Sequence, residues 1–316
     1  MNNNKLGTEE NPRHIVGLSG GKDSSALAIW IKQTRPDIHE KVEYYFTDTQ
    51  KELPEVTEYL DKLEVYLGKP IQYIKATVGD KKRIQFTTEE TEIDSFDDVL
   101  YNKYNGFLPA PMSRWCTRDL KIIPMEQWIG EDHCISYVGL RADEPERTGY
   151  VRKGKSNITP VYPFREDGLG INEIFKLLET TIGIPEYYKW RTRSGCTFCF
   201  FQRRVEYSIL FHLYPDLFKD AQKYESEHDD GRIFSWIKDR PLSYVAENSK
   251  DIIKRYIKKQ YKKSSEEYKQ GYTMTLEEML QCIDEDRIRE FIDTWDLKRL
   301  HDVDGENKDG CTVCAI

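Results

Sequence analysis

Residues 18–25 read Leu-Ser-Gly-Gly-Lys-Asp-Ser-Ser, and this stretch decides the fold that the sequence predicts. It follows an apolar run, residues 14–18, that is typical of a buried strand, and it leads into residues 23–33, whose apolar spacing is typical of a helix. The two glycines let the backbone turn tightly and approach a ligand without a Cβ clash. Because amide groups at the start of a helix point at anions, this arrangement predicts a phosphate-binding loop.

Each polar residue of the loop has a predicted role. Lys22 supplies a positive charge for a polyphosphate, and Asp23 has the carboxylate oxygens that Mg²⁺ prefers. The alternative is a glycine-rich turn that only caps the helix, but the complete segment between a strand and a helix favours a ligand site. The expected nucleotide-binding residues of the loop are Ser19, Gly20, Gly21, Lys22, Asp23, Ser24 and Ser25.

The composition is that of a globular chain of 316 residues, with 32% charged and 38% hydrophobic residues. No run approaches 18 apolar residues, and the N-terminal Met-Asn-Asn-Asn-Lys has no apolar segment, so we expect a cytoplasmic protein without a membrane span. The net charge of −8 does not indicate a nucleic-acid-binding protein, although local patches matter more than the total.

The first half of the chain alternates predicted strands and helices. Strands are expected at residues 43–47, 71–75 and 134–140, and residues 54–67 are expected to form a helix that begins at Pro54. Strands separated by helix-length segments indicate a parallel sheet, here of about five strands, that is covered on both faces. Residues 80–113 are polar and irregular, which predicts a lid or loop.

The last third of the chain is predicted to be helical. Helices are expected over residues 203–213, 215–228, 250–269 and 275–295, and Thr275 with Glu278 fits a capping box. The predicted fold is therefore α/β, with a nucleotide-binding domain over residues 1–194 and a helical, cysteine-bearing region over residues 195–316.

Seven cysteines are present, an odd number that argues against a disulfide framework in a cytoplasmic chain. Two C-x-x-C pairs, Cys196 with Cys199 and Cys311 with Cys314, offer four thiolates, which suit Zn²⁺ or an iron–sulfur cluster. The alternative for the first pair is that both are buried small hydrophobic residues. Cys134 and Cys282 fall in a strand pattern and a helix pattern, so we expect both to be structural.

Two basic segments have alternative interpretations. Residues 254–263 predict a basic helix, which either contacts DNA phosphates or is a solvated face. Four arginines flank the first C-x-x-C pair, and they either lower the pKa of the thiols or hold a nucleic-acid backbone. These arginines are Arg191, Arg193, Arg203 and Arg204.

Residues 18–25 resemble the PP-loop of the adenine nucleotide α-hydrolase superfamily, whose members have a Rossmann-like parallel sheet and cleave ATP between its α- and β-phosphates. Four further segments resemble the PAPS reductase-like branch of that superfamily. They are Phe46-Thr-Asp-Thr49, Trp115-Cys-Thr-Arg-Asp-Leu-Lys121 with Pro124, Val138-Gly-Leu-Arg-Ala-Asp-Glu144 with Arg147, and Thr159-Pro-Val-Tyr-Pro163.

The resemblance implies further site residues. Thr47, Asp48, Gly139 and Arg141 would contact the nucleotide. The catalytic set would be Lys22, Asp23, Arg118, Lys121 and Arg141, in which the cations neutralise the triphosphate in the transition state. The alternatives are that Arg118 and Lys121 form a solvated helix face, and that Arg141 and Arg147 pair with Asp143 and Glu144.

The choice of branch depends on the loop and on the cysteines. Sulfonucleotide reductases of this branch typically have a loop that lacks Gly-Gly-Lys and end in a Glu-Cys-Gly-like tail, whereas this chain has Gly20, Gly21 and Lys22 and ends differently. Residues 194–199, 201–202 and 214–218 resemble the cysteine region of proteins that include DNA phosphorothioation ATPases. Those enzymes take sulfur from a cysteine desulfurase, and some carry a [4Fe-4S] cluster.

This second resemblance adds Cys116 as a candidate metal ligand. Cys116, Cys196 and Cys199 would then be joined by Cys311 or Cys314 around the cluster, with Zn²⁺ as the alternative metal. A third arrangement makes the tail pair a mobile dithiol that relays sulfur.

Three functions follow as expectations. The favoured one is an ATP pyrophosphatase that binds ATP and Mg²⁺ and adenylates an acceptor, by resemblance a DNA backbone phosphate, so that sulfur then displaces AMP. The second is a phosphoadenosine or adenosine phosphosulfate reductase. The third is a non-catalytic nucleotide-binding subunit that docks on a desulfurase. The acceptor, the metal and the oligomeric state stay open.

Overall fold

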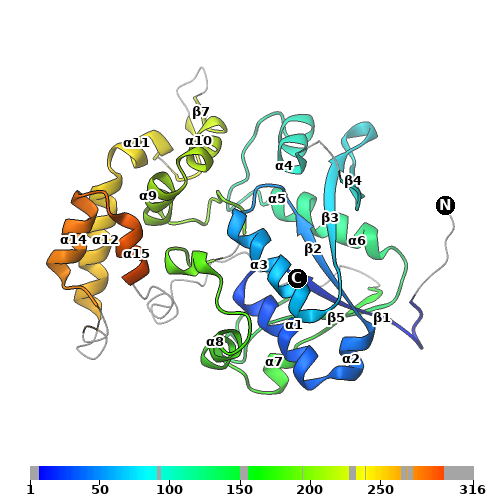
Figure 1. Cartoon of the computed structure of the whole chain (residues 1–316). Helices are drawn as coiled ribbons and strands as arrows, with labels where there is room; N and C mark the ends of the chain where they lie inside the picture. Colours follow the sequence, from blue (N-terminus) through cyan, green and yellow to red (C-terminus); the bar gives the residue numbers. More distant parts are fainter. Residues whose placement is uncertain are drawn as a thin grey trace.

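The computed structural model describes residues 7–90, 94–149, 156–193, 195–227, 233–238, 240–264, 269 and 273–294. A six-stranded sheet with the strand order β4-β3-β2-β1-β5-β6 forms its centre (Figure 1). The strands are β1 (Arg13–Leu18), β2 (Val42–Asp48), β3 (Ile71–Val78), β4 (Ile84–Thr87), β5 (Cys134–Tyr137) and β6 (Ile158–Val161). The predicted α/β fold is confirmed.

Five of the strands are parallel, as the alternation of strands and helices predicts. The chain runs from β1 to β2 on one side, and it returns to the other side of β1 when it enters β5. The strand order therefore reverses next to the carboxyl end of β1. In open α/β sheets ligands bind in the crevice at such a switch point, and the glycine-rich loop follows β1 directly.

Helices cover both faces of the sheet, and alternate residues of the strands enter different cores. Val16 and Tyr44 pack in the larger core with helices α1 and α3, whereas Ile15 and Tyr45 pack against α6 through Met125. The helices that lie around the sheet are α1 (Lys22–Thr34), α2 (Pro36–Lys41), α3 (Pro54–Leu67), α6 (Ile123–Ile129), α7 (Pro163–Glu166) and α8 (Ile171–Glu179).

The expectation of a lid or loop over residues 80–113 is wrong. This part of the chain contains η1 (Asp80–Lys82), the antiparallel strand β4, α4 (Ser95–Asp98) and the π-helical segment η2 (Val99–Lys103). Ile84, Phe96 and Leu100 are buried. The elements are three to five residues long, too short for a hydrophobic period to show in the sequence.

A helical stretch with a π-helical middle runs through the segment that contains Cys116. It consists of α5 (Trp115–Thr117), η3 (Arg118–Ile122) and α6. Pro124 has no N–H to donate to the carbonyl four residues earlier, so a regular α-helix cannot continue through this point. The wider turn carries Arg118 and Lys121, and Asp119 is fully buried in it.

The last third of the chain is helical, as predicted, and its helices lie beside the sheet (Figure 1). They are α9 (Arg204–Leu213), α10 (Pro215–Lys223), α11 (Leu242–Glu247), α12 (Ser249–Lys263), α14 (Leu276–Asp284) and α15 (Ile288–Thr294). A short hairpin, β7 (Ser226–Glu227) with β8 (Ile233–Phe234), lies among them.

Three helix boundaries differ from the predicted ones. The helix that begins at Pro215 ends at Lys223, and α12, expected to reach residue 269, ends at Lys263. The single helix expected over residues 275–295 is two, α14 and α15. The capping box of Thr275 and Glu278 is confirmed. One hydrophobic core runs from the sheet into these helices, so the domain boundary at residue 194 stays a prediction.

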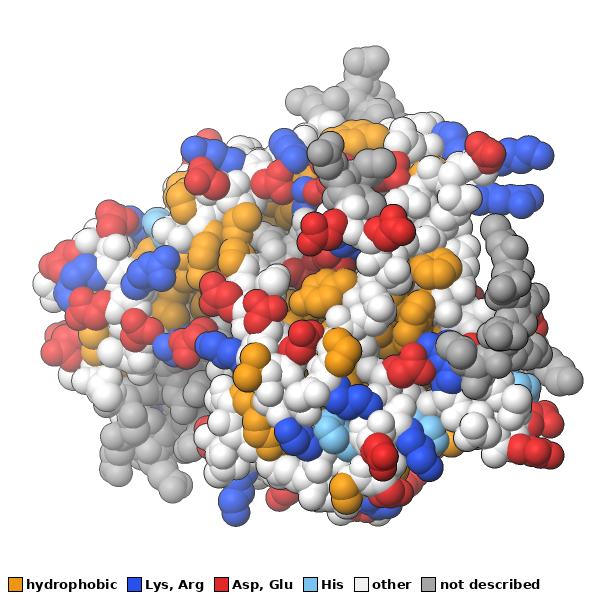
Figure 2. Space-filling model, turned by 45° about the vertical axis from the view of Figure 1, so that its right-hand side comes forward, with side chains coloured by type: hydrophobic (Ala, Val, Ile, Leu, Met, Phe, Trp, Pro, Cys, Tyr) orange, Lys and Arg blue, Asp and Glu red, His pale blue; other side chains and the backbone are white. Residues whose placement is uncertain are grey.

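On the face drawn in Figure 2, acidic and basic side chains are interspersed, and hydrophobic side chains appear in separate groups. Across the described ranges, no helix has the length and apolar character needed to traverse a bilayer.

The turn after β1 gives the first prediction. Gly20 has φ +64°, and a Cβ there would lie 2.6 Å from Val56 Cγ1, whereas Gly168 has φ +69° with open space around it. We expect Gly168→Ala to cost about 1–2 kcal/mol of unfolding free energy, the cost of a left-handed backbone. Gly20→Ala should cost about 1–3 kcal/mol more because α3 must also move. Urea unfolding of the two variants checks this, and equal losses would contradict it.

The buried Asp119 gives a prediction about pH. Its carboxylate accepts from Arg118 Nε at 2.6 Å and lies 2.8 Å from Lys103 Nζ. Burial alone would raise the pKa of Asp119, but these donors and Tyr104 hold it below the ordinary 3.8. A carboxylate with a lowered pKa stabilises the folded state above pH 3.8 and stops doing so as the pH falls through the lowered value.

We therefore expect Asp119→Asn to cost about 1.5–3 kcal/mol near neutral pH, since it removes the charge of a fully buried carboxylate that is hydrogen-bonded to Arg118 and paired with Lys103. The loss should shrink as the pH falls from 3.8, where the carboxyl of the unfolded parent becomes protonated, through the lowered pKa of the folded parent. Unfolding curves at several pH values measure this. Asp286→Asn removes a more exposed ion pair with Lys250 and should have a much smaller effect. A loss that does not depend on pH would contradict the assignment.

Candidate nucleotide site

The phosphate loop has the geometry that its sequence predicts. Gly20 turns in the left-handed region, and Gly21 precedes the first turn of α1. Tyr187 Oη, which is fully buried, donates to Gly20 O at 2.6 Å. The loop is therefore fixed from a segment more than 160 residues away in the sequence.

The predicted serine donors are largely engaged within the loop. Ser19 Oγ and Ser24 Oγ lie 3.1 Å apart, and Gly21 N donates to Ser19 Oγ. Ser25 Oγ is buried and has no hydrogen-bond partner among the described residues. The amide of Lys22, the first of α1, donates to Tyr188 Oη at 3.1 Å. A side chain of the protein thus occupies the helix start that the sequence predicts to be open to an anion.

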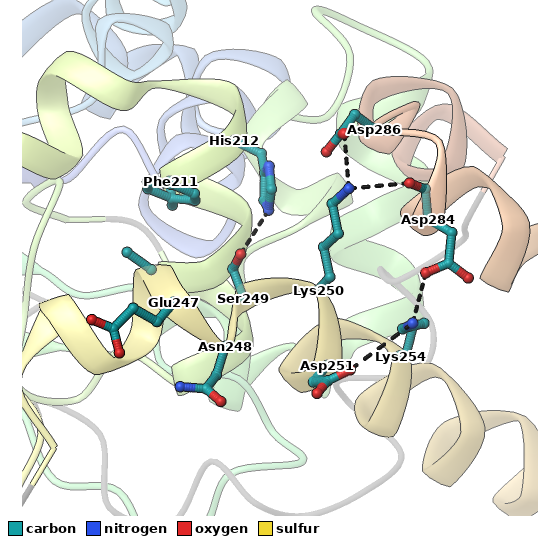
Figure 3. A pocket seen from close by; sticks show the side chains of 11 residues that line it. Phe211, His212, Glu247, Asn248, Ser249, Lys250, Asp251, Lys254, Asp284 and Asp286 are labelled. Carbon is teal, nitrogen blue, oxygen red and sulfur yellow. Dashed lines mark hydrogen bonds and ion pairs between the residues drawn. The ribbon is translucent and has the colours of Figure 1, made fainter.

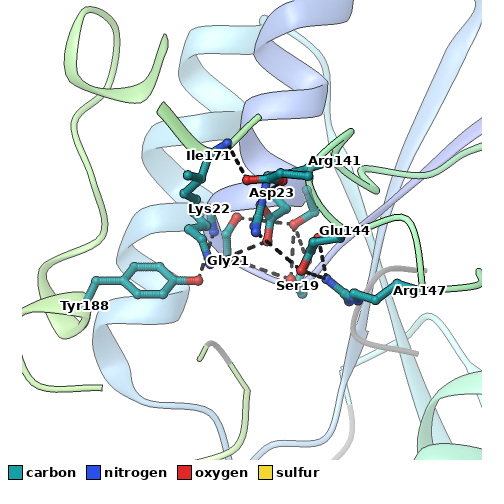
Figure 4. Close-up of polar contacts among 12 residues, drawn as sticks. Ser19, Gly21, Lys22, Asp23, Arg141, Glu144, Arg147, Ile171 and Tyr188 are labelled. Atoms are coloured by element: carbon teal, nitrogen blue, oxygen red, sulfur yellow. Dashed lines mark hydrogen bonds and ion pairs between the residues drawn. The ribbon is translucent and has the colours of Figure 1, made fainter. Parts of the chain in front are cut away.

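Lys22, Asp23 and Arg141 form a charged cluster beside the loop (Figure 4). Asp23 Oδ1 accepts from Arg141 Nη1 at 2.9 Å, and Asp23 Oδ2 lies 3.6 Å from Lys22 Nζ. Burial would raise the pKa of Asp23, but the charges of Lys22 and Arg141 together hold it below its ordinary value. The structure therefore brings together the predicted metal carboxylate and two of the predicted cations.

Arg141 also pairs with the carboxylates that follow it, as the alternative interpretation expects. Its Nε donates to Asp143 Oδ1 at 2.8 Å, and Arg147 Nη1 donates to Glu144 at 2.8 and 2.9 Å. Burial would lower the pKa of Arg141, but Asp23 and Glu144 raise it, so the guanidinium stays charged.

Gly139 explains how the loop after β5 reaches the phosphate loop. A Cβ at Gly139 would lie 2.8 Å from the backbone oxygen of Asp23. Only a residue without a side chain permits this approach, and the approach lets Arg141 reach Asp23.

The end of β2 forms the second side of the site. Thr47 lies inside the strand opposite Ile74, and Asp48 Oδ1 accepts from Gln50 N at 2.8 Å, which closes a turn. Asp48 also interacts with Glu52. The predicted adenosine contacts therefore lie at the same carboxyl edge as the phosphate loop, but the Asp48 side chain already closes this turn.

The cysteine loop, residues 195–202, docks on the same edge. Thr197 N donates to Lys51 O at 2.5 Å, and Glu52 pairs with Cys196 as a short antiparallel bridge. The hydroxyl of the buried Thr49 donates to Glu52 Oε1 at 2.7 Å and lies 3.2 Å from Cys196 Sγ. The first C-x-x-C pair is therefore next to the candidate nucleotide site.

The environment of Cys196 opposes ionisation of its thiol. Burial and the nearby Glu52 raise the pKa of Cys196 to about 12, although Lys121 works in the opposite direction. Burial and Asp48 in turn raise the pKa of Glu52 to about 7. For Cys196, the expectation that the flanking arginines lower the thiol pKa is wrong.

Among the described residues, no three Cys, His, Asp or Glu side chains converge to hold a metal ion. Cys116, Cys196 and Cys199 are partly buried, while Cys311 and Cys314 lie outside the described residues. Cys134 and Cys282 are buried, as their structural roles predict.

Two predicted cations of the helix after β4 have different surroundings. Arg118 is half-exposed and pairs with Asp119 and the Tyr104 hydroxyl. Lys121 lies close enough to Glu52 and Cys196 to influence the pKa of both. Arg118 and Lys121, which the sequence motif places in one catalytic group, therefore have different neighbours in the structure.

The basic helix α12 is partly neutralised at its first turns. Lys250 donates to Asp286 at 2.8 Å and Lys254 donates to Asp284 at 2.7 Å, at the rim of a cavity of about 620 Å³ (Figure 3). The cavity is also lined by Glu247 and Asp251. These ion pairs favour the interpretation of this part of the helix as a solvated face.

Four residues of the site were missed by the sequence analysis: Thr49, Glu52, Tyr187 and Tyr188. Thr49 was quoted only as part of a strand end, and Glu52 follows it by three residues. The two tyrosines belong to η4 (Glu186–Lys189), which carries no motif.

Comparisons with known proteins give a family match and a structural similarity. Residues 13–153 match the sequence family described as "Phosphoadenosine phosphosulfate reductase domain". No curated protein is significantly similar to the chain. Among solved structures, the chain is similar to phosphoadenylyl-sulfate reductase from Candida auris in a phosphate complex, with 13% identity and a TM-score of 0.40 over 59% of this chain and 82% of that one. The family match supports the PP-loop superfamily, whose PAPS reductase members act on nucleotides, for residues 13–153.

Proposed function

We propose that the chain binds ATP at the carboxyl edge of β1, β2 and β5 and releases pyrophosphate by transferring AMP to an acceptor oxygen. The observation that carries this proposal is the complete phosphate loop at the switch point, with Lys22 and Arg141 converging on Asp23. If Asp23 binds another partner, Lys22 and Arg141 lose the negative charge of its carboxylate. The anionic oxygens of a triphosphate would replace that charge.

Asp23 is suited to that exchange. Mg²⁺ prefers carboxylate and phosphate oxygens, so Asp23 would hold the ion together with the triphosphate, and the ion would neutralise phosphate charge. Lys22 and Arg141 would then be available to the phosphates. These two cations and the loop amides stabilise the charge that develops on the departing pyrophosphate.

The reaction has two balanced steps. The acceptor oxygen attacks the α-phosphorus, the bond from that phosphorus to the bridging oxygen breaks, and pyrophosphate leaves with the electron pair. A sulfur nucleophile then displaces AMP from the activated acceptor and forms the new bond to sulfur. The net change for the nucleotide is ATP to AMP and pyrophosphate.

The cysteine loop supports the sulfur step, because it docks beside the end of β2 within the same edge. We propose a cysteine desulfurase as the sulfur donor, on the resemblance of this loop to phosphorothioation enzymes. The terminal sulfur of its persulfide would displace AMP, and a thiol reductant would then cleave the S–S bond, so that one sulfur stays on the acceptor and the donor cysteine leaves in a disulfide with that thiol. The described residues do not by themselves fit a [4Fe-4S] cluster or a Zn²⁺ ion. Either one therefore depends on ligands from Cys311 and Cys314, and no step above uses it.

An acceptor with a phosphate backbone, which we propose to be DNA, is supported by the arginines around the cysteine loop. From residue 187 to residue 205 the chain has five cations and no carboxylate. The guanidinium groups of Arg114 and Arg193 lie 4.9 and 5.6 Å from the ring centre of Phe201, which holds both beside the loop. Arginines suit phosphate groups because their donors bind in pairs.

The family match favours a second function, reduction of a sulfonucleotide. That reaction predicts sulfite release from adenosine or phosphoadenosine phosphosulfate with a thiol reductant and no requirement for ATP. The complete loop with Lys22 argues for the triphosphate.

The test of the proposal is the fate of ATP labelled at the α-phosphate. We expect labelled AMP and pyrophosphate in the presence of DNA and a sulfur donor. Lys22→Met, which removes the charge and keeps the length, should lower the rate by about 100-fold or more. Lys41→Met, an exposed lysine on α2, is the matched control and should have no effect.

The products separate the candidate functions. ADP release would rule out the proposed reaction. Sulfite release from a sulfonucleotide would favour the reductase, and ATP binding without turnover in the complete mixture would favour a non-catalytic subunit. Thermal unfolding of Lys22→Met shows whether a lost rate reflects lost folding.

The arginines give a separate prediction. Replacing Arg114 and Arg193 together by Gln should weaken DNA binding and reduce the slope of log K against log salt by about 1–2, since each lost phosphate contact accounts for about 0.9. A matched pair on the exposed side of α12, Lys258→Gln with Lys259→Gln, should leave the slope unchanged. The reverse result would place the DNA contact on α12.

A further inference from the structure

The start of α1 is already occupied by a side chain. Tyr188 Oη accepts from the Lys22 amide at 3.1 Å, and the Lys22 ammonium lies 5.3 Å from the centre of the Tyr188 ring (Figure 4). Tyr188 is only 5% exposed. An anion that approaches this amide, which is the first one of the helix, therefore meets the tyrosine hydroxyl.

We propose that Tyr188 is a latch that a polyphosphate displaces, and that its release reaches the cysteine loop. This inference rests on the proposed polyphosphate ligand of the loop. A phosphate oxygen makes a charge-assisted hydrogen bond with the amide, which is roughly twice as strong as the bond to a neutral hydroxyl. The phosphate also gives the Lys22 ammonium a negatively charged partner in place of the face of the Tyr188 ring.

The neighbouring tyrosine has the opposite relation to the loop. Tyr187 Oη donates to Gly20 O, a carbonyl that a phosphate does not need. The rings of Tyr187 and Tyr188 lie 4.7 Å apart within η4. Tyr187 therefore supports the loop in its binding conformation, while Tyr188 competes with the ligand for the loop.

A short path connects η4 to the cysteines. Arg191 N donates to Tyr187 O at 2.8 Å, and Arg191 Nη2 donates to the carbonyl oxygen of Cys196 at 2.8 Å. Arg191 is only 3% exposed. Its side chain is therefore surrounded by protein, and its position depends on these two hydrogen bonds. Movement of η4 is thereby transmitted to the cysteine loop, and the two sites are coupled in both directions.

Calorimetric titration with inorganic pyrophosphate and with ATP tests the latch on the full-length chain. Tyr188→Phe removes the competing acceptor and should tighten pyrophosphate binding about three- to tenfold, the equivalent of one hydrogen bond. Tyr187→Phe, the matched control, leaves Gly20 O without its donor and should weaken binding. Weaker binding of pyrophosphate by Tyr188→Phe would overturn the proposal, because the hydroxyl would then be a ligand contact.

Alkylation of the cysteines, read by mass spectrometry at Cys196 and Cys199, tests the coupling. Pyrophosphate should change the alkylation rate in the parent protein, and Tyr188→Phe without pyrophosphate should already show the changed rate. If pyrophosphate does not alter the alkylation rate of the parent protein, the link to the cysteine loop is overturned. Failure of both proteins to bind pyrophosphate would overturn the latch and the proposed function together. Binding without AMP release would count against the proposed function alone.

Discussion

The contact between Asp23 and Arg141 is the interaction on which the site depends. It joins the loop after β1 to the loop after β5, the two strands between which the sheet reverses its order. It requires that Gly139 pass within contact distance of the Asp23 backbone. In an open parallel sheet these two loops otherwise diverge, so the ion pair holds them close together at the switch point.

The same contact balances the charges beside the phosphate loop. A buried cation without a counter-charge is costly, and here Asp23 compensates Lys22 and Arg141 while Tyr188 satisfies the first amide of α1. Of the loop groups described above, Ser25 Oγ has no hydrogen-bond partner within the part of the chain that the structure describes, whereas the Lys22 amide and the Asp23 carboxylate do. The polyphosphate that we propose would replace these partners, so its affinity would be the difference between its own contacts and those that it displaces.

Local sequence was sufficient for the parts of the fold that follow from local rules. The loop residues Gly20 and Lys22, the parallel strands and helix α3 were all predictable because glycine, proline and apolar spacing act over a few residues. The elements within residues 80–113 were not predictable, since helices and strands of three to five residues show no hydrophobic period. The roles of Tyr187 and Glu52 were not predictable either, because each contacts a partner that is more than 140 residues away in the sequence.

The cysteine loop shows why charge along the sequence is a poor guide to charge in space. Arginines surround the C-x-x-C motif in the chain and predict an acidic thiol, yet Cys196 has a raised pKa because of its burial and because the segment after β2 brings Glu52 to it. Phe201 instead holds Arg193 and Arg114 together at the edge of the loop. Arg193, which lies near the motif along the sequence, is thus held by an aromatic ring, while burial and a carboxylate from another part of the chain favour the neutral form of the Cys196 thiol.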